Sequence, residues 1–260
     1  MSIKDLLDMS GDIVIITGGA THLGKAMATA YAEMNAKVYI ASRRRTLCEQ
    51  VAEELRLEGL NCIGMGCDVT KEVEVNKLVE TIVKDNGKLD VMVCNAGASV
   101  TTSYLPEASI DEFMMTMEIN LKSTYLCAQA ASRYMIPRNY GKIITLGSIH
   151  GILGADKRQY GARKRSGPPY QAAKGGIINL TRGLATELGE FGITVNCISP
   201  GQIPPDTVDE TVADNWRLNN PLFRSGVPED ITGAALLLGS RAGNWITGHN
   251  LVVDGGWSVW

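Results

Sequence analysis

Short apolar segments alternate with longer amphipathic segments along the whole chain of 260 residues. Most of the short segments are continuous apolar runs, which is typical of strands buried on both faces of a parallel sheet. Seven such strands are predicted: Asp12–Thr17, Lys37–Ser42, Asn61–Asp68, Leu89–Asn95, Gly141–Ser148, Thr194–Ser199 and Asn250–Asp254. The alternation predicts an α/β fold, with a doubly wound, mostly parallel seven-stranded sheet and right-handed crossovers.

The segments between these strands have the apolar spacing of helices. The predicted helices are His22–Asn35, Arg45–Glu58, Lys71–Asn86, Ile110–Ile136, Tyr170–Glu190, Val208–Arg217 and Pro228–Leu238. No repeat and no linker rich in Pro, Gly or Ser divides the chain, so we expect a single domain over residues 1–260. Ligands of doubly wound sheets bind at the carboxyl ends of the strands, near the point where strand order reverses. Motifs at those ends are therefore the candidate site.

Composition excludes several classes of function. A net charge of −3 argues against a whole-surface nucleic-acid binder. The apolar runs are too short for a membrane span, and residues 1–10 do not form a signal peptide. The six cysteines contain no CxxC pair, and the three histidines have no ligand spacing. We expect structural thiols, no metal, no membrane or nucleic-acid partner, and a cytoplasmic location.

A glycine-containing turn follows the first predicted strand and precedes a helix. It reads Thr17-Gly18-Gly19-Ala20-Thr21-His22-Leu23-Gly24. Glycines let the backbone turn tightly and approach a pyrophosphate at the helix N-terminus, so Gly18, Thr21, His22, Leu23 and Gly24 are candidate cofactor contacts. The alternative is a strand–helix turn that binds nothing. His22 replaces one expected glycine, and its Cβ crowds the pyrophosphate unless the turn opens slightly. Its imidazole could contact a phosphate, but a tolerated bulky turn residue is favoured.

The end of the second strand bears on the choice of cofactor. NAD sites usually place an acidic residue there for the ribose hydroxyls. This strand ends in Ser42-Arg43-Arg44-Arg45, and a guanidinium can instead pair with a 2′-phosphate. Ser42 and Arg43 therefore favour NADP(H), with NAD(H) left open, unless the arginines only begin a solvated helix. After the third strand, at Asp68-Val69, the Asp68 side chain could meet the adenine edge, and it could also cap the next helix, since the two roles do not exclude each other.

Several motifs in order along the chain resemble the short-chain dehydrogenase/reductase family. They are the glycine turn, Asp68-Val69, Asn95-Ala96-Gly97, Asn120, Ser148, Tyr170-Gln171-Ala172-Ala173-Lys174, Pro200-Gly201 and the tail Ile246 to Gly256. The resemblance covers nearly the whole chain. It implies a Rossmann-type fold, an NAD(P) cofactor that Asn95, Ala96, Gly97, Pro200, Gly201 and Ile203 also contact, and a catalytic tetrad of Asn120, Ser148, Tyr170 and Lys174.

The tetrad's residue types suit proton transfer to or from an alcohol oxygen. Tyr170 and Lys174 are four residues apart on a helix and share a face. A free phenol has a pKa of ~10, and a neighbouring ammonium favours the phenolate. Tyr170 can then act as general base or acid, and Ser148 can hydrogen-bond the same substrate oxygen. The resemblance assigns Lys174 also to the nicotinamide ribose, and Asn120 to a water that relays protons to Lys174.

The chain departs from the family between Ser148 and Tyr170, where the spacing is longer than usual. The extra residues, about 151–169, carry five cations and one acid; we call this segment the flap. Its ends lie beside the reacting carbon, so it could bind an anionic group of the substrate. Arg163, Arg165 and His150 are the candidate substrate contacts. A solvated cationic loop is the alternative.

A second segment, residues 202–224, is the expected substrate lid. Thr207 is a substitute for a threonine that many relatives place earlier in this loop. Trp216, Leu218 and Phe223 line the pocket or pack within the lid. The resemblance also implies that the apolar end at Trp257 and Trp260 packs on a neighbouring subunit, in a homotetramer or homodimer.

Together these features predict an NAD(P)-dependent enzyme that interconverts a secondary alcohol and a ketone. The cationic flap favours a small polar substrate, such as a sugar acid, a polyol or another anionic hydroxy compound. The first alternative is a 3-oxoacyl-thioester reductase, whose acyl-carrier protein the flap would meet. The second is an NAD(P)-binding regulator without catalysis, which would not need Ser148, Tyr170 and Lys174 together. An enoyl reductase is disfavoured because its tyrosine and lysine are spaced differently.

Overall fold

A computed structural model describes residues 2–100, 105–160, 167–205 and 210–260 of the chain. Its centre is a seven-stranded sheet in the order β3-β2-β1-β4-β5-β6-β7. The strands are β1 (Ile13–Thr17), β2 (Lys37–Ser42), β3 (Cys62–Gly66), β4 (Val91–Cys94), β5 (Gly141–Leu146), β6 (Ile193–Pro200) and β7 (Asn250–Val253). All six neighbouring pairs are parallel. The predicted doubly wound fold is confirmed, and strand order reverses between β1 and β4.

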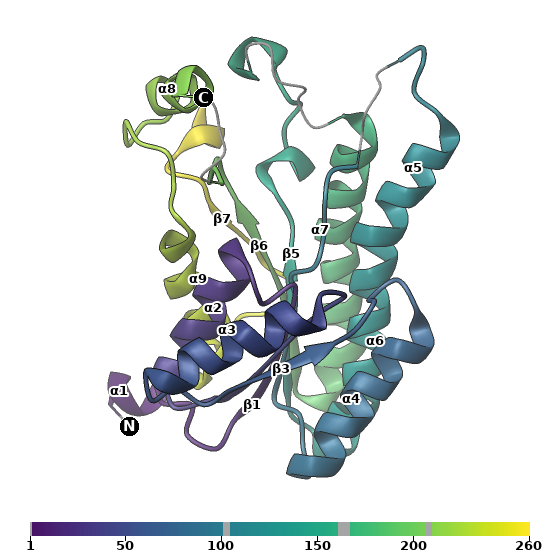
Figure 1. Ribbon diagram of the computed structural model, residues 1–260, viewed down its shortest axis with the longest axis vertical. Helices are drawn as coiled ribbons and strands as arrows, with labels where there is room; N and C mark the ends of the chain where they lie inside the picture. The colour runs from purple at the N-terminus through teal and green to yellow at the C-terminus, as the bar shows by residue number, and fades with distance from the viewer. Residues whose placement is uncertain (1, 101–104, 161–166, 206–209) are drawn as a thin grey trace.

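Helices cover both faces of the sheet (Figure 1). Helices α2 (His22–Glu33), α3 (Arg45–Leu57) and α9 (Thr232–Gly239) pack on one face with the core around Val14, Ile16 and Val38. Helices α4 (Glu72–Asn86), α6 (Ser123–Met135) and α7 (Pro168–Leu188) cover the other face, around Ile15, Met92 and Val195. Alternate residues of β1 thus belong to opposite cores, because successive side chains of a strand point to opposite faces.

The remaining elements are short or lie at the edges of the sheet. Helix α5 (Ile110–Met117) continues through the π-helical turn η1 (Glu118–Lys122) into α6, whereas the sequence predicted one uninterrupted helix. Helices α1 (Ile3–Leu7) and α8 (Glu210–Leu218) complete the set. The 3-10 turns are η2 (Ile136–Arg138), η3 (Ile149–Gly151), η4 (Lys157–Tyr160), η5 (Gly189–Phe191), η6 (Pro228–Ile231), η7 (Arg241–Gly243) and η8 (Trp257–Val259). None of the described helices is long and apolar enough to cross a membrane.

Local chemistry explains where two of these helices begin and end. Helix α4 has Glu72 and Glu74 in its first turn, where carboxylates favour the positive end of the helix dipole. It ends at Gly87, which adopts the left-handed conformation that glycine tolerates best. Helix α7 begins with Pro168 and Pro169, whose fixed φ suits a first turn. The two prolines therefore set the start of the helix that carries Tyr170 and Lys174.

Candidate active site

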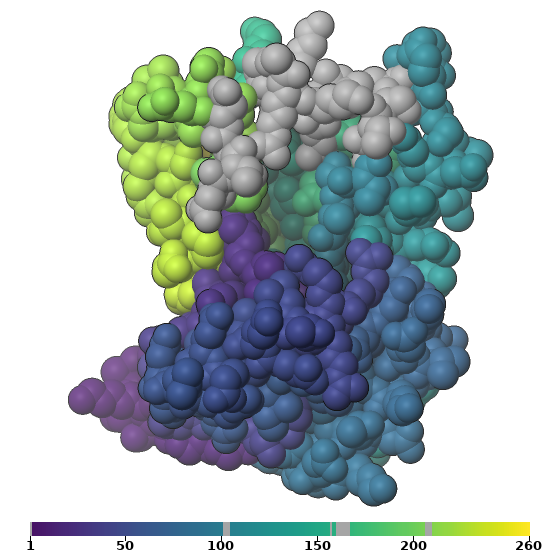
Figure 2. All heavy atoms as spheres, in the orientation of Figure 1, coloured from purple at the N-terminus to yellow at the C-terminus, as the bar shows by residue number. Residues whose placement is uncertain are grey.

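A cleft of ≈ 730 Å³ opens at the carboxyl ends of the strands. It runs across the point of strand reversal, and Figure 2 shows the hollow between the purple-to-blue first part of the chain and the teal middle part. Every predicted cofactor contact lines it: Gly18, Thr21, His22, Leu23, Gly24, Ser42, Arg43, Asp68, Val69, Asn95, Ala96, Gly97, Tyr170, Lys174, Pro200, Gly201 and Ile203. Ser148 lines the cleft as well. The fold thus brings together motifs that follow the strands β1 to β6.

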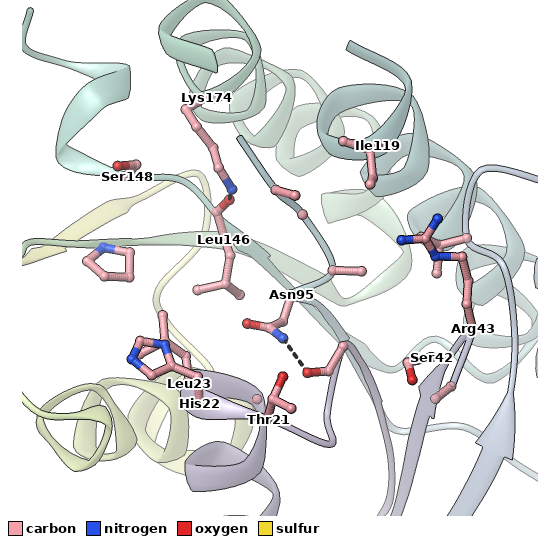
Figure 3. A pocket seen from close by; sticks show the side chains of 18 of the residues that line it. Thr21, His22, Leu23, Ser42, Arg43, Asn95, Ile119, Leu146, Ser148 and Lys174 are labelled. Atoms are coloured by element: carbon pink, nitrogen blue, oxygen red, sulfur yellow. Dashed lines mark hydrogen bonds between the residues drawn. The ribbon is translucent and has the colours of Figure 1, made fainter. Parts of the chain in front are cut away.

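The glycine turn is fixed to the end of β4 by Asn95. Its amide Nδ2 donates to the carbonyl oxygen of Gly18 at 3.1 Å (Figure 3). It also donates to the carbonyl oxygen of Thr17 at 2.9 Å. A Cβ on Gly24 would overlap the Gly18 oxygen, so only glycine lets the first turn of α2 approach this closely. Among the described side chains, none caps the N-terminus of α2. Its first N–H groups therefore remain available for a pyrophosphate, which suits a dinucleotide.

The backbone of His22 adopts the left-handed conformation, which is why a glycine is expected at this position. Its φ is positive and lies in the left-handed region, which disfavours side chains with a Cβ. The ring Nε2 lies 3.4 Å from the carbonyl oxygen of Pro204, in the loop that leads from β6 into the lid. The exposed imidazole therefore lies between the glycine turn and the base of the lid.

Two arginines line the far end of the cleft, beyond β2. Arg43 and Arg44 are exposed there, and no described carboxylate forms an ion pair with either. Arg45 instead begins α3 and pairs with Glu49 at 2.7 Å. Ser42 Oγ accepts the backbone N–H of Arg44 at 3.2 Å, which shapes the turn that presents the two guanidinium groups. This end of the cleft is cationic and suits a phosphate group.

Asp68 belongs to the cleft and does not cap a helix. Helix α4 begins at Glu72, and Lys71 precedes it, so the predicted cap role is wrong. Asp68 Oδ1 instead accepts from the backbone N–H and the hydroxyl of Thr70, at 3.1 and 2.8 Å. Although partial burial opposes it, the hydrogen bonds of Thr70 lower the pKa of Asp68. The carboxylate is thereby held on the rim of the cleft.

The opposite end of the cleft brings Ser148, Tyr170 and Lys174 together. Lys174 Nζ lies 5.5 Å from the centroid of the Tyr170 ring. Ser148 Oγ accepts the backbone N–H of His150 at 3.1 Å, which leaves its own O–H free to point elsewhere. A Cβ on Gly151 would lie 2.8 Å from the carbonyl carbon of Lys174. The absence of a Cβ at Gly151 therefore lets the segment after Ser148 pack directly on the backbone of α7.

Lys174 is buried, and its ammonium has one hydrogen-bond partner in the described part of the chain. Nζ donates to the carbonyl oxygen of Leu146 at 2.7 Å (Figure 3). Burial lowers the pKa of Lys174 to about 8, although the neighbouring Cys197 opposes the shift. The side chain is thus cationic below about pH 8 and can exchange a proton near neutrality.

Asn120 lies in the π-helical turn of the long helix, a feature that often marks functional positions. Its Nδ2 donates to the carbonyl oxygens of Ala98 at 2.8 Å and Thr116 at 2.9 Å. Within the described residues its Oδ1 is buried without a hydrogen-bond partner. A Cβ on Gly97 would lie 2.6 Å from this oxygen and 3.5 Å from Lys174 Nζ, so both atoms face the same space. A water in that space would satisfy the oxygen.

The predicted substrate contacts are described only in part. His150 lies on η3, and its ring makes an edge-to-face contact with the Tyr170 ring, with the two centroids 6.4 Å apart and the planes at 71°. Burial lowers its pKa, which favours the neutral imidazole. In the flap, the exposed Arg158 pairs with Asp156, the flap's one acid, at 2.6 Å. Arg163, Arg165 and Thr207 lie outside the described residues.

The apolar lid residues separate into two groups. Trp216 is buried and packs within the lid beside Val212, Ala155 and Trp257. Leu218 and Phe223 are 58% and 65% exposed, so neither is buried in a pocket wall. Trp257, which is expected at a subunit contact, is half-buried against Trp216 and Val212, and Trp260 is exposed.

Sequence reasoning missed several residues that line the cleft. They are Ala41, Arg44, Cys67, Thr70, Ala98, Ile119, Leu146 and Gly147. Each lies within two positions of a predicted site residue along the chain. No signal in the sequence showed which of these nearby residues the backbone turns toward the cleft. All six cysteines are buried and unpaired, as predicted. The described residues contain no group of three or more side chains that could hold a metal ion.

Comparison with known proteins finds similarity over almost the whole chain. The model of the family described as "Enoyl-(Acyl carrier protein) reductase" matches residues 18–258. The 5-keto-D-gluconate 5-reductase of Escherichia coli (strain K12) is 33% identical over 261 residues, which cover 98% of this chain and 99% of that protein. These matches include every motif that lines the cleft.

Two solved structures are similar along their full length. A short-chain type dehydrogenase/reductase from Mycobacterium marinum superposes with a TM-score of 0.90 at 34% identity, covering 99% of each chain. A gluconate 5-dehydrogenase from Burkholderia cenocepacia J2315, in complex with NADP and tartrate, superposes with a TM-score of 0.90 at 28% identity, covering 100% of each chain. The likeness extends to both ends of the cleft.

Proposed function

This chain belongs to the short-chain dehydrogenase/reductase family and is an oxidoreductase acting on CH–OH groups; from that premise we propose that Asn120, Ser148, Tyr170 and Lys174 carry its chemistry. The observation that supports the proposal most is Lys174 Nζ at 5.5 Å from the Tyr170 ring, at one end of a cleft that suits a dinucleotide. When bound, the nicotinamide ring accepts or supplies the hydride.

In this mechanism Tyr170 moves the proton at the substrate oxygen. The Lys174 ammonium favours the phenolate, which takes the proton of an alcohol; the phenol returns it to a ketone in the reverse direction. Ser148 donates its free O–H to the same oxygen and stabilises the charge that develops there. The buried Asn120 Oδ1 holds a water that passes protons to Lys174.

We propose NADP(H) as the preferred cofactor, with Ser42 and Arg43 at its 2′-phosphate and Arg44 beside them. Two cleft-lining guanidinium groups without a described carboxylate partner support this choice. Asp68 and Val69 are assigned to the adenine, and the turn from Gly18 to Gly24 to the pyrophosphate. Asn95 to Gly97, Pro200, Gly201 and Ile203 are assigned to the nicotinamide half.

We propose a small anionic hydroxy compound, such as a sugar acid, as the substrate. Arg158 already pairs with the one acid of the flap, so the flap's other four cations give it a net positive charge. The similar proteins named for keto-gluconate and gluconate are consistent with such a substrate. His150, Arg163 and Arg165 are the proposed contacts. The spacing of Tyr170 and Lys174 disfavours the enoyl reduction named in the family description.

The remaining features of the proposal concern the protein as a whole. We propose one domain over residues 1–260 that acts in the cytoplasm, which six buried free cysteines support, because reducing compartments keep thiols unpaired. We also propose a homotetramer or homodimer. Trp245, Val259 and Trp260 are all exposed. Large apolar side chains at a surface commonly mark an interface.

The proposed chemistry is tested by Tyr170→Phe, which removes the hydroxyl and keeps the ring. We expect absorbance at 340 nm to report oxidation of sugar acids, faster with NADP⁺ than with NAD⁺. The variant should lose about 10²- to 10⁴-fold in kcat, because proton transfer contributes that much. NADP⁺ binding, measured by calorimetry, should be unchanged. A Tyr140→Phe variant, far from the cleft, is the control. Turnover that survives Tyr170→Phe would remove Tyr170 from the mechanism.

A further inference from the structure

Three segments that are far apart in the sequence meet at the carboxyl edge of the sheet. They are residues 155–160 of the flap, helix α8 with Asn219, and Trp257 of the C-terminal tail; we call this group the cap. In Figure 1 the C-terminus lies beside α8. The cap has its own small apolar cluster, separate from the two cores that cover the sheet.

The apolar part of the cap comes from one face of α8. Val212 and Trp216 are four residues apart, so they share a face, and both are buried. Ala155 of the flap and Trp257 pack against them. The other face of α8 carries Asp214 and Arg217, which form an exposed ion pair. Helix α8 is therefore amphipathic, and its apolar face is covered by the flap and the tail.

A polar contact fixes the same arrangement. Asn219 Nδ2 donates to Gln159 Oε1 at 2.8 Å, and also to the carbonyl oxygen of Asn215 at 2.8 Å. The two hydrogens of this amide are thus both used, one within the lid and one across to the flap. Gln159 N–H donates to the carbonyl oxygen of Asp156 at 3.1 Å, which orders the flap turn that receives the contact.

The cap is joined by short stretches of chain to both sides of the reacting end of the cleft. The flap begins at the end of η3, just after the cleft residue Ser148, and the lid begins directly after the cleft residue Gly201. Neither segment can shift relative to the other without separating Ala155 from Trp216 and Gln159 from Asn219. Resting on the proposed function, we infer that residues 155–160 of the flap and 210–219 of the lid act together as one cap, and that Ala155, Gln159, Trp216 and Asn219 are positioning residues for the substrate.

The cap is tested first without any assay of activity. Ala155→Asp places a carboxylate against the Trp216 cluster, and hydrogen exchange measured by mass spectrometry follows peptides covering 155–160 and 210–219. We expect faster exchange in both peptides, because separating the flap also uncovers α8. Arg217→Ala, on the exposed face of the same helix, should leave both peptides unchanged. Faster exchange in the mutated segment alone would overturn the cap, whatever reaction the enzyme catalyses.

The positioning role is tested by a double-mutant cycle on Gln159→Ala and Asn219→Ala. Each single variant should raise KM for the substrate by about 2- to 10-fold, the worth of one hydrogen bond, with kcat and NADP⁺ affinity within about twofold of the parent. The KM of the double variant should match that of Asn219→Ala, because either single change already removes the hydrogen bond between flap and lid, and only Asn219→Ala also removes the bond to Asn215. Independent effects that multiply in the double variant, or an unchanged KM, would contradict the positioning role. Failure of the parent enzyme to turn over any substrate would instead count against the proposed function.

Discussion

The charge that a single residue carries in this site depends on how deeply the fold buries it. Lys174 is an ordinary lysine in sequence, yet burial lowers its pKa to about 8. It is therefore charged below about pH 8 and loses the charge above it, together with the support that this charge gives a Tyr170 phenolate. Arg43 and Arg44 differ from Lys174 in burial, since both are exposed at the other end of the cleft.

The role of Arg43 can be tested by Arg43→Ala. We expect NADP⁺ affinity to fall about 10- to 100-fold, because hydrogen bonds to a charged phosphate are lost, whereas NAD⁺ affinity stays nearly constant. Calorimetric titration with each cofactor measures the difference. Arg45→Ala is the matched control, since Arg45 pairs with Glu49 and is not in the cleft lining. An equal loss for both cofactors would contradict a 2′-phosphate contact.

At the scale of elements, strand β5 contains a buried residue, far from the site, that destabilises the folded state. Lys142 is 2% exposed, and its Nζ has no hydrogen-bond partner in the parts of the chain that the structure describes. Burial lowers its pKa to about 8, against the attraction of the Asp12 carboxylate. Burial likewise raises the pKa of Asp12 to about 6. An ammonium held in this way destabilises the folded state, because charge is disfavoured where water is excluded.

Lys142→Met should therefore stabilise the protein. The folded-state pKa lies below the unfolded one, so the penalty is complete below about pH 8 and disappears as the pH rises toward the pKa of a free lysine. We expect a gain of about 1 to 3 kcal/mol in the free energy of unfolding at pH 7. The rise in stability between about pH 8 and 10 should be smaller than in the parent. Lys77→Met, at an exposed position, is the control for urea denaturation at both pH values.

At the scale of the whole molecule, the cleft joins two halves of the sheet. The glycine turn, Arg43 and Asp68 follow β1, β2 and β3, whereas Asn95, Ser148 and Gly201 follow β4, β5 and β6. A dinucleotide that bridges the strand reversal contacts both halves at once. Its binding is then coupled to the stability of the entire fold, because the unfolded chain has no such cleft.

This coupling predicts a thermal shift. At a concentration about 100 times its Kd, NADP⁺ should add about 2.7 kcal/mol, and for a chain of this size each kcal/mol raises Tm by about 2–4 °C. We expect a rise of roughly 5–10 °C by scanning calorimetry. NAD⁺ should need a higher concentration for the same shift. A Tm that responds to neither cofactor would count against dinucleotide binding.

The seven strands and most helices could be predicted from the sequence, because continuous apolar runs and helical periodicity are local and strong. Most motifs of the cleft were also visible, since they lie close after a strand, as Asn95 follows β4 and Ser148 lies two residues after β5. The residues at which a single helix begins or is interrupted were harder to predict from the sequence. The π-helical turn at Asn120 interrupts a segment that helical spacing predicts as one helix, and Asp68 has a residue type common to caps and to binding sites.

The sequence by itself therefore determined the sheet, its helices and the order of the motifs, because these depend on neighbouring residues. Tertiary structure decided which motifs lie side by side and which charged side chains are buried, paired or exposed. It packed Trp257 and Ala155 on Trp216, left Arg44 facing the cleft while Arg45 pairs with Glu49, and buried both Lys142 and Lys174. Each of these outcomes depends on atoms brought from distant parts of the chain, and so does the electrostatic environment of every group in the site.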